Sequence, residues 1–283
     1  MQNILITGSS GFIGSNILLN ILNKHNIYIT SRSKISNKLK ELKVIHYKNH
    51  LDLNKKLKKI KIDIIIHCGT HYVKNHNVSD INKLTLANIE FGVILLENLK
   101  SMGVKKFINF STVWQNYNGK QDIAYNLYSA FKLSYSKILD YYIGKFSFIR
   151  FYNLFISDTY GENDNRSKII NLIKQNIKNK KKIRIVSKKL SINLLNVKDI
   201  VAAVRIIVDK NVKPGKYNVT NNKNIKIYNL VKKIKKVKKI KNLIKFENNS
   251  FKKDRIFYYK KLPGWQPRYS SFKDLIRFVL GQS

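Results

Sequence analysis

The octapeptide TGSSGFIG, Thr7 to Gly14, follows a short apolar segment and precedes an apolar run with helical spacing. Three glycines at this spacing between a strand and a helix are typical of a dinucleotide-binding turn. Gly8 permits a tight turn, Gly11 lets backbone N–H groups approach a pyrophosphate, and Gly14 lets the helix pack closely on the strand. The phosphate charge then meets the N-terminus of the helix. The stretch therefore predicts a dinucleotide site within the first fifteen residues.

Short β-branched segments alternate with helical patterns after this turn. We expect strands at 27–30, 43–47, 62–67, 105–110 and 146–152, and helices at 12–23, 52–59, 79–102 and 124–143. This alternation predicts an α/β fold with a Rossmann-type doubly wound parallel sheet. In such sheets the candidate chemistry lies at the carboxyl ends of the strands.

The pattern changes after residue 161, to a helix from about 168, a strand at 182–186 and further short elements. We therefore predict a dinucleotide-binding Rossmann domain over 1–165 and a smaller C-terminal substrate-binding lobe over 166–283. Within the second part, residues 191–212 are expected to return to the first domain.

The composition is extremely basic, with 55 Lys and Arg against 16 Asp and Glu and a formal net charge of +39. The excess is spread along the whole chain, and only eight of the basic residues are arginine, which suggests drift toward AT-rich codons. Because arginine reads bases and phosphates bidentately, its scarcity argues against a nucleic-acid partner.

Other features of the composition point to a cytoplasmic protein. Cys68 is the only cysteine, so no internal disulfide is possible. A strand and a glycine loop stand where a signal peptide would be, and no apolar run approaches the length of a membrane span. We expect no membrane partner. No His, Cys and carboxylate cluster has metal-ligand spacing, so no metal is predicted either.

Tyr128 and Lys132 lie four residues apart on one face of the helix expected at 124–143. An ammonium beside a phenol lowers the pKa of the phenol, so the pair is suited to proton transfer near neutrality. The chain has four Tyr-x-x-x-Lys pairs, so spacing alone does not select this one. Only Tyr128 begins the helix that follows a strand ending in Ser111 and Thr112.

These motifs together resemble the extended short-chain dehydrogenase/reductase family of nucleotide-sugar enzymes, also called the NAD-dependent epimerase/dehydratase family. Further segments extend the resemblance over essentially the full length: HCGT at 67–70, ANIEFGVILLEN with Asn88, DTYGENDNR at 158–166, NLLNVKDI and LPGWQP. The resemblance implies a nicotinamide cofactor on the first domain, a nucleotide sugar between the two parts, and a homodimer.

The family's functional residues can be carried over one by one. Tyr128 would be the general acid or base, Lys132 would hold the nicotinamide ribose, and Thr112 would bond the sugar oxygen, with Ser111 as second choice. Contacts with the cofactor would come from the glycine turn and the strand ends that follow it: Gly8, Ser10, Gly11, Phe12, Ile13, Gly14, Ser31, Arg32, Asp52, Leu53, His67, Gly69 and Lys132. Contacts with the substrate would come from His71, Thr112, Tyr128, Asn153 and Arg255.

Several of these assignments have open alternatives. Asp52, matched to an adenine contact, could equally be a solvated helix cap. Asn153, expected just past the sixth strand, could cap a turn. Arg255, matched to a pyrophosphate-binding arginine, could be a surface residue. His71, like His76, could be an ordinary loop histidine.

Two departures from the family pattern narrow the reaction. The dehydratases of the family carry Asp-Glu directly after the catalytic threonine, whereas this chain has Val113 and Trp114, so we do not expect 4,6-dehydration. A carboxylate at the end of the second strand would favour NAD by repelling a 2'-phosphate. This chain has hydroxyls and cations there, Ser31, Arg32 and Lys34 among them, which favours NADPH.

The sequence thus predicts an NADPH-dependent reductase of a nucleotide-linked 4-keto-6-deoxyhexose, in the synthesis of sugars for surface polysaccharides such as lipopolysaccharide. Within the family it is most similar to the CDP-abequose and CDP-paratose synthase type, which favours a CDP-sugar. An NAD(P)-dependent 4-epimerase and a non-catalytic NADP-binding regulator are the alternatives.

Overall fold

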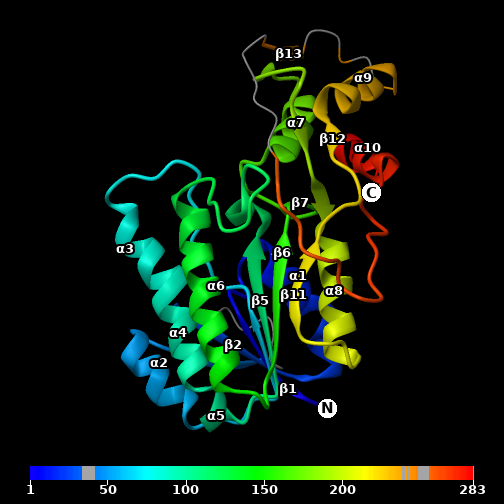
Figure 1. Ribbon diagram of the computed structural model, residues 1–283. Coiled ribbons are helices and arrows are strands. Elements are labelled where there is room, and N and C mark those ends of the chain that lie inside the picture. Colours follow the sequence, from blue (N-terminus) through cyan, green and yellow to red (C-terminus); the bar gives the residue numbers. More distant parts are fainter. Residues whose placement is uncertain (34–41, 238–239, 241–242, 248–254, 283) are drawn as a thin grey trace.

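The computed structural model describes residues 1–33, 42–237, 240, 243–247 and 255–282, so Lys34 lies outside the described residues. A seven-stranded sheet forms the larger part, with a smaller lobe above its carboxyl end (Figure 1). Every neighbouring pair in the sheet is parallel. The predicted Rossmann-type doubly wound sheet is therefore confirmed. In sheet order the strands are β11 (Gly215–Val219), β6 (Arg150–Ile156), β5 (Lys106–Thr112), β4 (Ile64–His67), β1 (Asn3–Thr7), β2 (Asn26–Ser31) and β3 (Lys43–His46).

Helices cover both faces of the sheet, so each strand buries its side chains in two directions. In β1, Ile4 and Ile6 join the core beneath α1 (Phe12–Ile21) and α8 (Val197–Asp209), while Leu5 joins the core on the other face. The helices of that other face are α2 (His50–Leu57), α3 (Asp80–Thr85), α4 (Phe91–Glu97), α5 (Leu99–Met102) and α6 (Leu127–Lys145).

The lobe has a core of its own, which its three helices share with short strand pairs. The helices are α7 (Ile169–Lys178), α9 (Ile227–Val237) and α10 (Phe272–Leu280). The strand pairs are β7 (Asp158–Tyr160) with β10 (Leu194–Asn196), β8 (Ile183–Ile185) with β13 (Ile244–Phe246), and β9 (Ser191–Ile192) with β12 (Ile225–Lys226).

The return of the chain to the sheet lies later than the predicted 191–212, because β9 and β10 form strand pairs of the lobe and the return runs from α8 to β11. After the crossover helix α8, β11 pairs with β6 as the seventh strand, with Gly215 opposite Tyr152. Leu262 and Trp265 also pack into the core of the sheet. These two segments, expected in the lobe, therefore belong to the sheet domain.

The strand expected at 146–152 begins four residues later, because α6 continues to Lys145 and a turn follows it. Asn153 consequently lies in the middle of β6, opposite Asn109 of β5, and not past the end of the strand.

The helix expected at 79–102 is interrupted. Between α3 and α4 the chain forms a π-helical segment, Leu86–Glu90, which contains the buried Asn88. The Asn88 amide accepts hydrogen bonds from the Thr70 hydroxyl and the His71 backbone N–H, and donates to the His71 carbonyl. The irregular turn thus aims one side chain at the loop after β4, as π-bulges at functional sites often do.

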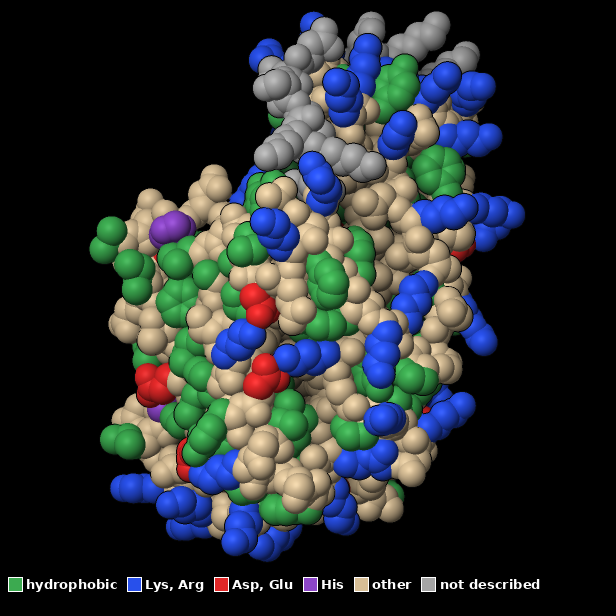
Figure 2. All heavy atoms as spheres, viewed as in Figure 1, with side chains coloured by type: hydrophobic (Ala, Val, Ile, Leu, Met, Phe, Trp, Pro, Cys, Tyr) green, Lys and Arg blue, Asp and Glu red, His purple; other side chains and the backbone are tan. Residues whose placement is uncertain are grey.

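Lysine and arginine side chains are scattered over the face shown in Figure 2, from the lobe to the opposite end of the sheet domain. Among the residues that the structure describes, no helix is long and apolar enough to cross a membrane.

Candidate functional site

The glycine turn has the geometry that a bound phosphate group requires. Gly8 has a φ of +65°, and a Cβ on Gly14 would lie 2.2 Å from the Gly8 carbonyl oxygen, so neither position accepts a larger residue without a shift of the backbone. Gly11 is the N-cap of α1 and has no side chain to cap the helix. The first N–H groups of α1 are therefore suited to an anionic ligand.

The ends of β1 and β4 meet directly behind this turn. The Thr7 hydroxyl lies 2.8 Å from Nδ1 of His67 and accepts a hydrogen bond from the Gly69 backbone N–H. Burial lowers the pKa of His67 to about 3, with a smaller contribution from the positive charge of Lys132. His67 is therefore a neutral part of the floor of the site at physiological pH.

Lys132 reaches this floor from α6. Only 4% of the residue is exposed, and within the described ranges no carboxylate forms an ion pair with it. Burial lowers the pKa of the ammonium to about 8, and the nearby Cys68 opposes this shift slightly. A buried cation without a counterion costs stability, and such groups cluster at functional sites.

Tyr128 lies half-buried at the start of α6, where its ring packs edge-on against Tyr72 with the centroids 4.9 Å apart. Burial raises the pKa of the phenol, while a hydrogen bond with Thr70 and the charges of Lys168 and Arg166 lower it. Lys132 is not among the largest influences on this pKa, so its expected effect on the phenol stays a prediction. The two cations that lower this pKa, Lys168 and Arg166, lie in the lobe and not in the sheet domain.

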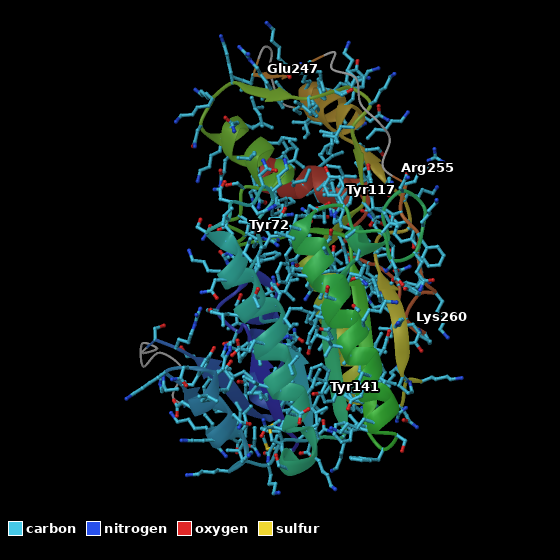
Figure 3. All side chains as sticks on the ribbon, turned by 60° about the vertical axis from the view of Figure 1, so that its left-hand side comes forward. Tyr72, Tyr117, Tyr141, Glu247, Arg255 and Lys260 are labelled. Atoms are coloured by element: carbon cyan, nitrogen blue, oxygen red, sulfur yellow. The ribbon has the colours of Figure 1, made fainter. Side chains whose placement is uncertain are left out.

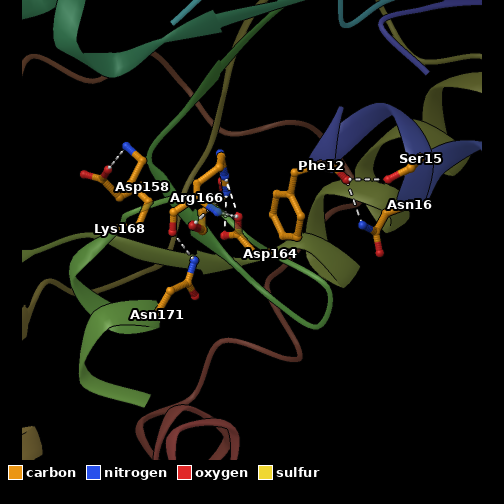
Figure 4. A network of polar contacts seen from close by, with 9 residues as sticks. Phe12, Ser15, Asn16, Asp158, Asp164, Arg166, Lys168 and Asn171 are labelled. Atoms are coloured by element: carbon orange, nitrogen blue, oxygen red, sulfur yellow. Dashed lines mark hydrogen bonds and ion pairs between the residues drawn. The ribbon is translucent and has the colours of Figure 1, made fainter. Parts of the chain in front are cut away.

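These lobe residues form a polar network at the junction with the sheet domain (Figure 4). Lys168 forms an ion pair with Asp158 at 3.1 Å. Arg166 forms two hydrogen bonds with Asp164, at 2.7 and 2.8 Å, and its guanidinium lies 4.3 Å from the ring centroid of Phe12. The network thus touches the first residue of α1, beside the glycine turn.

The strand end that carries Thr112 is also buried. The Thr112 hydroxyl accepts a hydrogen bond from the Trp114 backbone N–H, so it caps the 3-10 turn Val113–Asn116. Ser111 points into the protein, where its hydroxyl donates to Oε1 of Gln115 at 2.6 Å. Of the two hydroxyls, Thr112 lies at the end of β5.

Asn153 lies in the same interior network. Its amide oxygen accepts a hydrogen bond from Asn109, and its amide nitrogen donates to the Ser136 hydroxyl. Only 2% of Asn153 is exposed. This position between two strands gives Asn153 a structural role, because both polar atoms of its side chain have partners.

A small cavity of about 20 Å³ begins one residue past Thr112. It lies between the sheet domain and the lobe, and the Ser157 hydroxyl, buried beside it, has no hydrogen-bond partner in the described structure. A buried polar atom of this kind suits a ligand. The cavity is lined by Val113, Trp114, Ser157, Asp158, Ser191, Ile192, Asn193, Asn224, Ile256 and Tyr258.

Two of the predicted substrate contacts, His71 and Arg255, are not among the residues that line this cavity. His71 follows Thr70, and its Nε2 atom is buried without a partner among the described residues. Arg255 is exposed and precedes Ile256 of the cavity wall, and its carbonyl accepts a hydrogen bond from Gly119. In Figure 3, Arg255 lies near Tyr117, away from Tyr72.

The predicted adenosine contacts lie near the ends of β2 and β3. The Ser31 hydroxyl donates to the Ser33 carbonyl, and Arg32 is exposed. Asp52 accepts hydrogen bonds from the Lys48 backbone N–H and from Lys56, which hold its pKa below the usual value. Asp52 thus acts as a helix-end residue of α2, the alternative left open by the sequence. The remaining predicted contacts are Ser10, which is exposed, Ile13, which is partly buried, and Leu53, which is fully buried.

The sequence alone did not single out the residues that surround Tyr128. Thr70, Tyr72, Arg166 and Lys168 lie in segments that matched the family or followed them, but their contacts join parts of the chain about 40 to 100 residues apart. The one available signal in the sequence was that Thr70 and Tyr72 shortly follow the end of β4.

A Rossmann sheet with a glycine turn, a buried lysine and a half-buried tyrosine at its carboxyl edge defines the class: a dinucleotide-dependent enzyme of the short-chain dehydrogenase/reductase type. Residues 4–220 match the model of the NAD dependent epimerase/dehydratase family. The chain belongs to this family, whose members are NAD(P)-dependent enzymes that modify nucleotide sugars.

Individual relatives are more distant. The chain is 28% identical over 233 residues to the CDP-abequose synthase of Yersinia pseudotuberculosis, a match that covers 80% of this chain and 78% of that protein. Its fold is similar to the UDP-N-acetylglucosamine 4-epimerase of Methanobrevibacter ruminantium, with a TM-score of 0.82, 20% identity and coverage of 99% and 97%. The UDP-glucose 4-epimerase of Thermus thermophilus in complex with NAD gives a TM-score of 0.79 at 17% identity, with coverage of 99% and 98%.

Proposed function

We propose that the protein uses NADPH to reduce the 4-keto group of a nucleotide-linked 4-keto-6-deoxyhexose, with a CDP-sugar as the favoured substrate. The observation that carries this proposal is the position of Thr112 at the carboxyl end of β5, with Tyr128 and the buried Lys132 in the first turns of α6, which packs on β5. The likeness to a CDP-abequose synthase supports the choice of nucleotide.

The residues present fit a nicotinamide dinucleotide. The positive φ of Gly8 and the missing Cβ of Gly14 leave backbone where a phosphate can approach, and no described carboxylate forms an ion pair with the buried Lys132. The glycine turn would hold the pyrophosphate, and Lys132 would hold the nicotinamide ribose. When bound, the reduced nicotinamide supplies a hydride.

Side chains of the protein would then align the substrate carbonyl and supply the proton. Thr112 would bond the carbonyl oxygen of the substrate and align it. As the bond between carbon and oxygen loses its double character, the Tyr128 hydroxyl donates its proton to the developing alkoxide. The resulting phenolate regains a proton from solvent. Because burial raises the pKa of Tyr128, the phenol remains protonated, as an acid must, at neutral pH.

The choice of NADPH rests on the end of β2. Ser31 and Arg32 stand where a carboxylate would repel a 2'-phosphate, and Arg32 is exposed and free to approach a ligand. The apolar side chains of Val113 and Trp114 in the cavity wall support reduction over dehydration, because they supply neither acid nor base next to Thr112.

The experiment is to mix purified protein and NADPH with CDP-, dTDP-, GDP- and UDP-4-keto-6-deoxyhexoses and follow the loss of NADPH absorbance. We expect the fastest oxidation with the CDP-sugar, and a product reduced at C4. If no sugar oxidises NADPH, the proposal fails. Interconversion of a reduced sugar without added NADPH would instead support a 4-epimerase, and cofactor binding without any turnover would support a regulator.

A further inference from the structure

A second lysine, Lys168, faces the proposed catalytic tyrosine from the lobe. Its ammonium lies 4.6 Å from the ring centroid of Tyr72, and that ring packs edge-on against Tyr128 at 4.9 Å and 82°. Asp158 forms an ion pair with the same ammonium, at 3.1 Å. The Lys168 ammonium thus contacts the Tyr72 ring, and the Tyr72 ring in turn contacts the Tyr128 ring.

The three residues come from three different parts of the fold. Tyr128 starts α6, Tyr72 follows β4, and Lys168 is the N-cap residue of α7 in the lobe. Asp158, at the start of β7, also belongs to the lobe side. The ammonium therefore stands near Tyr128 only when the lobe and the sheet domain are packed together.

The charged groups around the phenol are few. From α6 comes Lys132, whose charge faces His67 and Cys68. From the lobe come Lys168 and Arg166, which are paired with Asp158 and Asp164, and of the two Lys168 acts more strongly on Tyr128. The remaining titratable neighbour is Tyr72.

Lys168 keeps its charge in this setting. Burial works against the ammonium, but Asp158 and Tyr72 outweigh burial, so the pKa of Lys168 is raised. A cation that remains charged beside a phenol stabilises the phenolate more than the phenol. Of the charges that act on Tyr128, Lys168 contributes most.

We propose that Lys168 is a positioning residue for the reaction: it holds Tyr72 against Tyr128 and stabilises the phenolate that forms when Tyr128 gives up its proton. The proposal rests on the proposed role of Tyr128 as the acid. The proton-transfer step then depends on the lobe, because the lobe carries the Lys168 charge that stabilises the phenolate of the sheet domain.

The test compares Lys168→Met and Lys168→Gln with a matched control, Lys174→Met. Lys174 belongs to the same lobe, forms an ion pair with Glu162 at 3.1 Å and lies 3.9 Å from the ring centroid of Phe278. The control removes a lysine with the same kinds of contact but without contact with Tyr128. Lys168→Gln keeps a hydrogen-bond donor for Asp158, so it preserves folding if the Met variant does not.

Two readouts are needed. The first is the pH profile of NADPH oxidation: we expect the fall in rate at high pH to shift upward by about one pH unit in both Lys168 variants, as for loss of a nearby cation. The rate at neutral pH should fall, because Tyr128 becomes a weaker acid. Lys168→Arg should restore the wild-type profile, and Lys174→Met should leave it unchanged.

The second readout does not need activity. In protein labelled with 3-fluorotyrosine, the fluorine signal that Tyr128→Phe removes reports the titration of Tyr128 directly. We expect the same upward shift in the Lys168 variants. An unchanged titration in a folded Lys168 variant would overturn the proposal, even if the substrate were not a sugar. A shifted titration without any sugar turnover would support the role of Lys168 while the proposed function fails.

Discussion

The two lysines near Tyr128 deal with burial in opposite ways. Lys132, in the sheet domain, is almost fully buried, and its pKa falls to about 8. Lys168, in the lobe, has Asp158 as a partner, and its pKa rises. The comparison teaches that the sheet side of the site holds a buried cation at an electrostatic cost, whereas the lobe side holds its cation charged by pairing it with a carboxylate. The four predictions below test this contrast.

The largest effect is expected at the residue between the two sides. Tyr128→Phe removes the proton donor and keeps the ring that packs on Tyr72, so kcat should fall by about 10³, in the range for loss of a general acid. The affinity for NADPH, measured by titration with NADPH fluorescence as the signal, should change little. A variant with near wild-type kcat would remove Tyr128 from the reaction.

Lys132→Met should make the protein more stable and less active. A lysine whose pKa drops from 10.5 to about 8 on folding destabilises the folded state below pH 8, and the penalty disappears as the pH rises toward 10.5. At pH 7 the gain in the free energy of unfolding should be at most about 3 kcal/mol, and it should shrink above pH 8. Urea unfolding at several pH values measures this. A loss of stability at pH 7 would show that Lys132 has stabilising partners when folded.

His67 should make the sheet side acid-sensitive. Its pKa of about 3 in the folded protein lies below the 6.5 of the unfolded chain, so stability is lost as the pH falls below 6.5. From pH 6.5 to pH 5 the loss should be about 2 kcal/mol. His67→Asn, which keeps a polar atom for Thr7, should be less stable at pH 7 because it loses ring contacts with Phe91 and Phe107, but its stability should fall less with acid.

Equal acid sensitivity of the wild type and His67→Asn would contradict this assignment. The ion pairs of the lobe side serve as the internal comparison. Asp164 is held below its usual pKa by Arg166 in spite of burial, so its contribution should be lost only at more acidic pH than that of His67.

The smallest effect is expected at the exposed end of β2. Arg32→Ala should lower the preference for NADPH over NADH by about tenfold, the scale of one charged contact with a phosphate. Thermal stability should not change, since Arg32 is exposed. The measurement is kcat/KM for both cofactors, and an unchanged ratio would remove Arg32 from cofactor choice.

The sequence predicted most of the sheet and the positions at its carboxyl edge, because both depend on local patterns. The turn from Thr7 to Gly14 needs glycines at fixed spacing, and each strand of the sheet is a short apolar run. The prediction failed at 146–152, where an apolar stretch continues through Ile156 and gives no sign of where helix α6 ends. Because of that error, Asn153 was expected past the end of the strand, whereas it lies in the middle of β6.

The arrangement around Tyr128 was not predictable in the same way. Lys132 is four residues away and was paired with Tyr128 by helical spacing, yet the groups that act on the phenol are Thr70, Lys168 and Arg166. Their contacts depend on how the lobe packs on the sheet, which no local pattern encodes. The π-helical turn that aims Asn88 at Thr70 was equally unpredictable, because its sequence has the pattern of a continuous helix.

The path of the chain between the two cores limits how the site can open. After β6 the chain enters the lobe core, returns to the sheet core with Leu195, re-enters the lobe with Ile225, and comes back again at Leu262 and Trp265 before α10. The buried Asp199 secures the last return by accepting hydrogen bonds from the Arg268 and Tyr269 backbone N–H groups and from the Ser270 hydroxyl. Several crossings of the chain therefore join the two cores, and any movement of the lobe relative to the sheet domain would have to bend all of them.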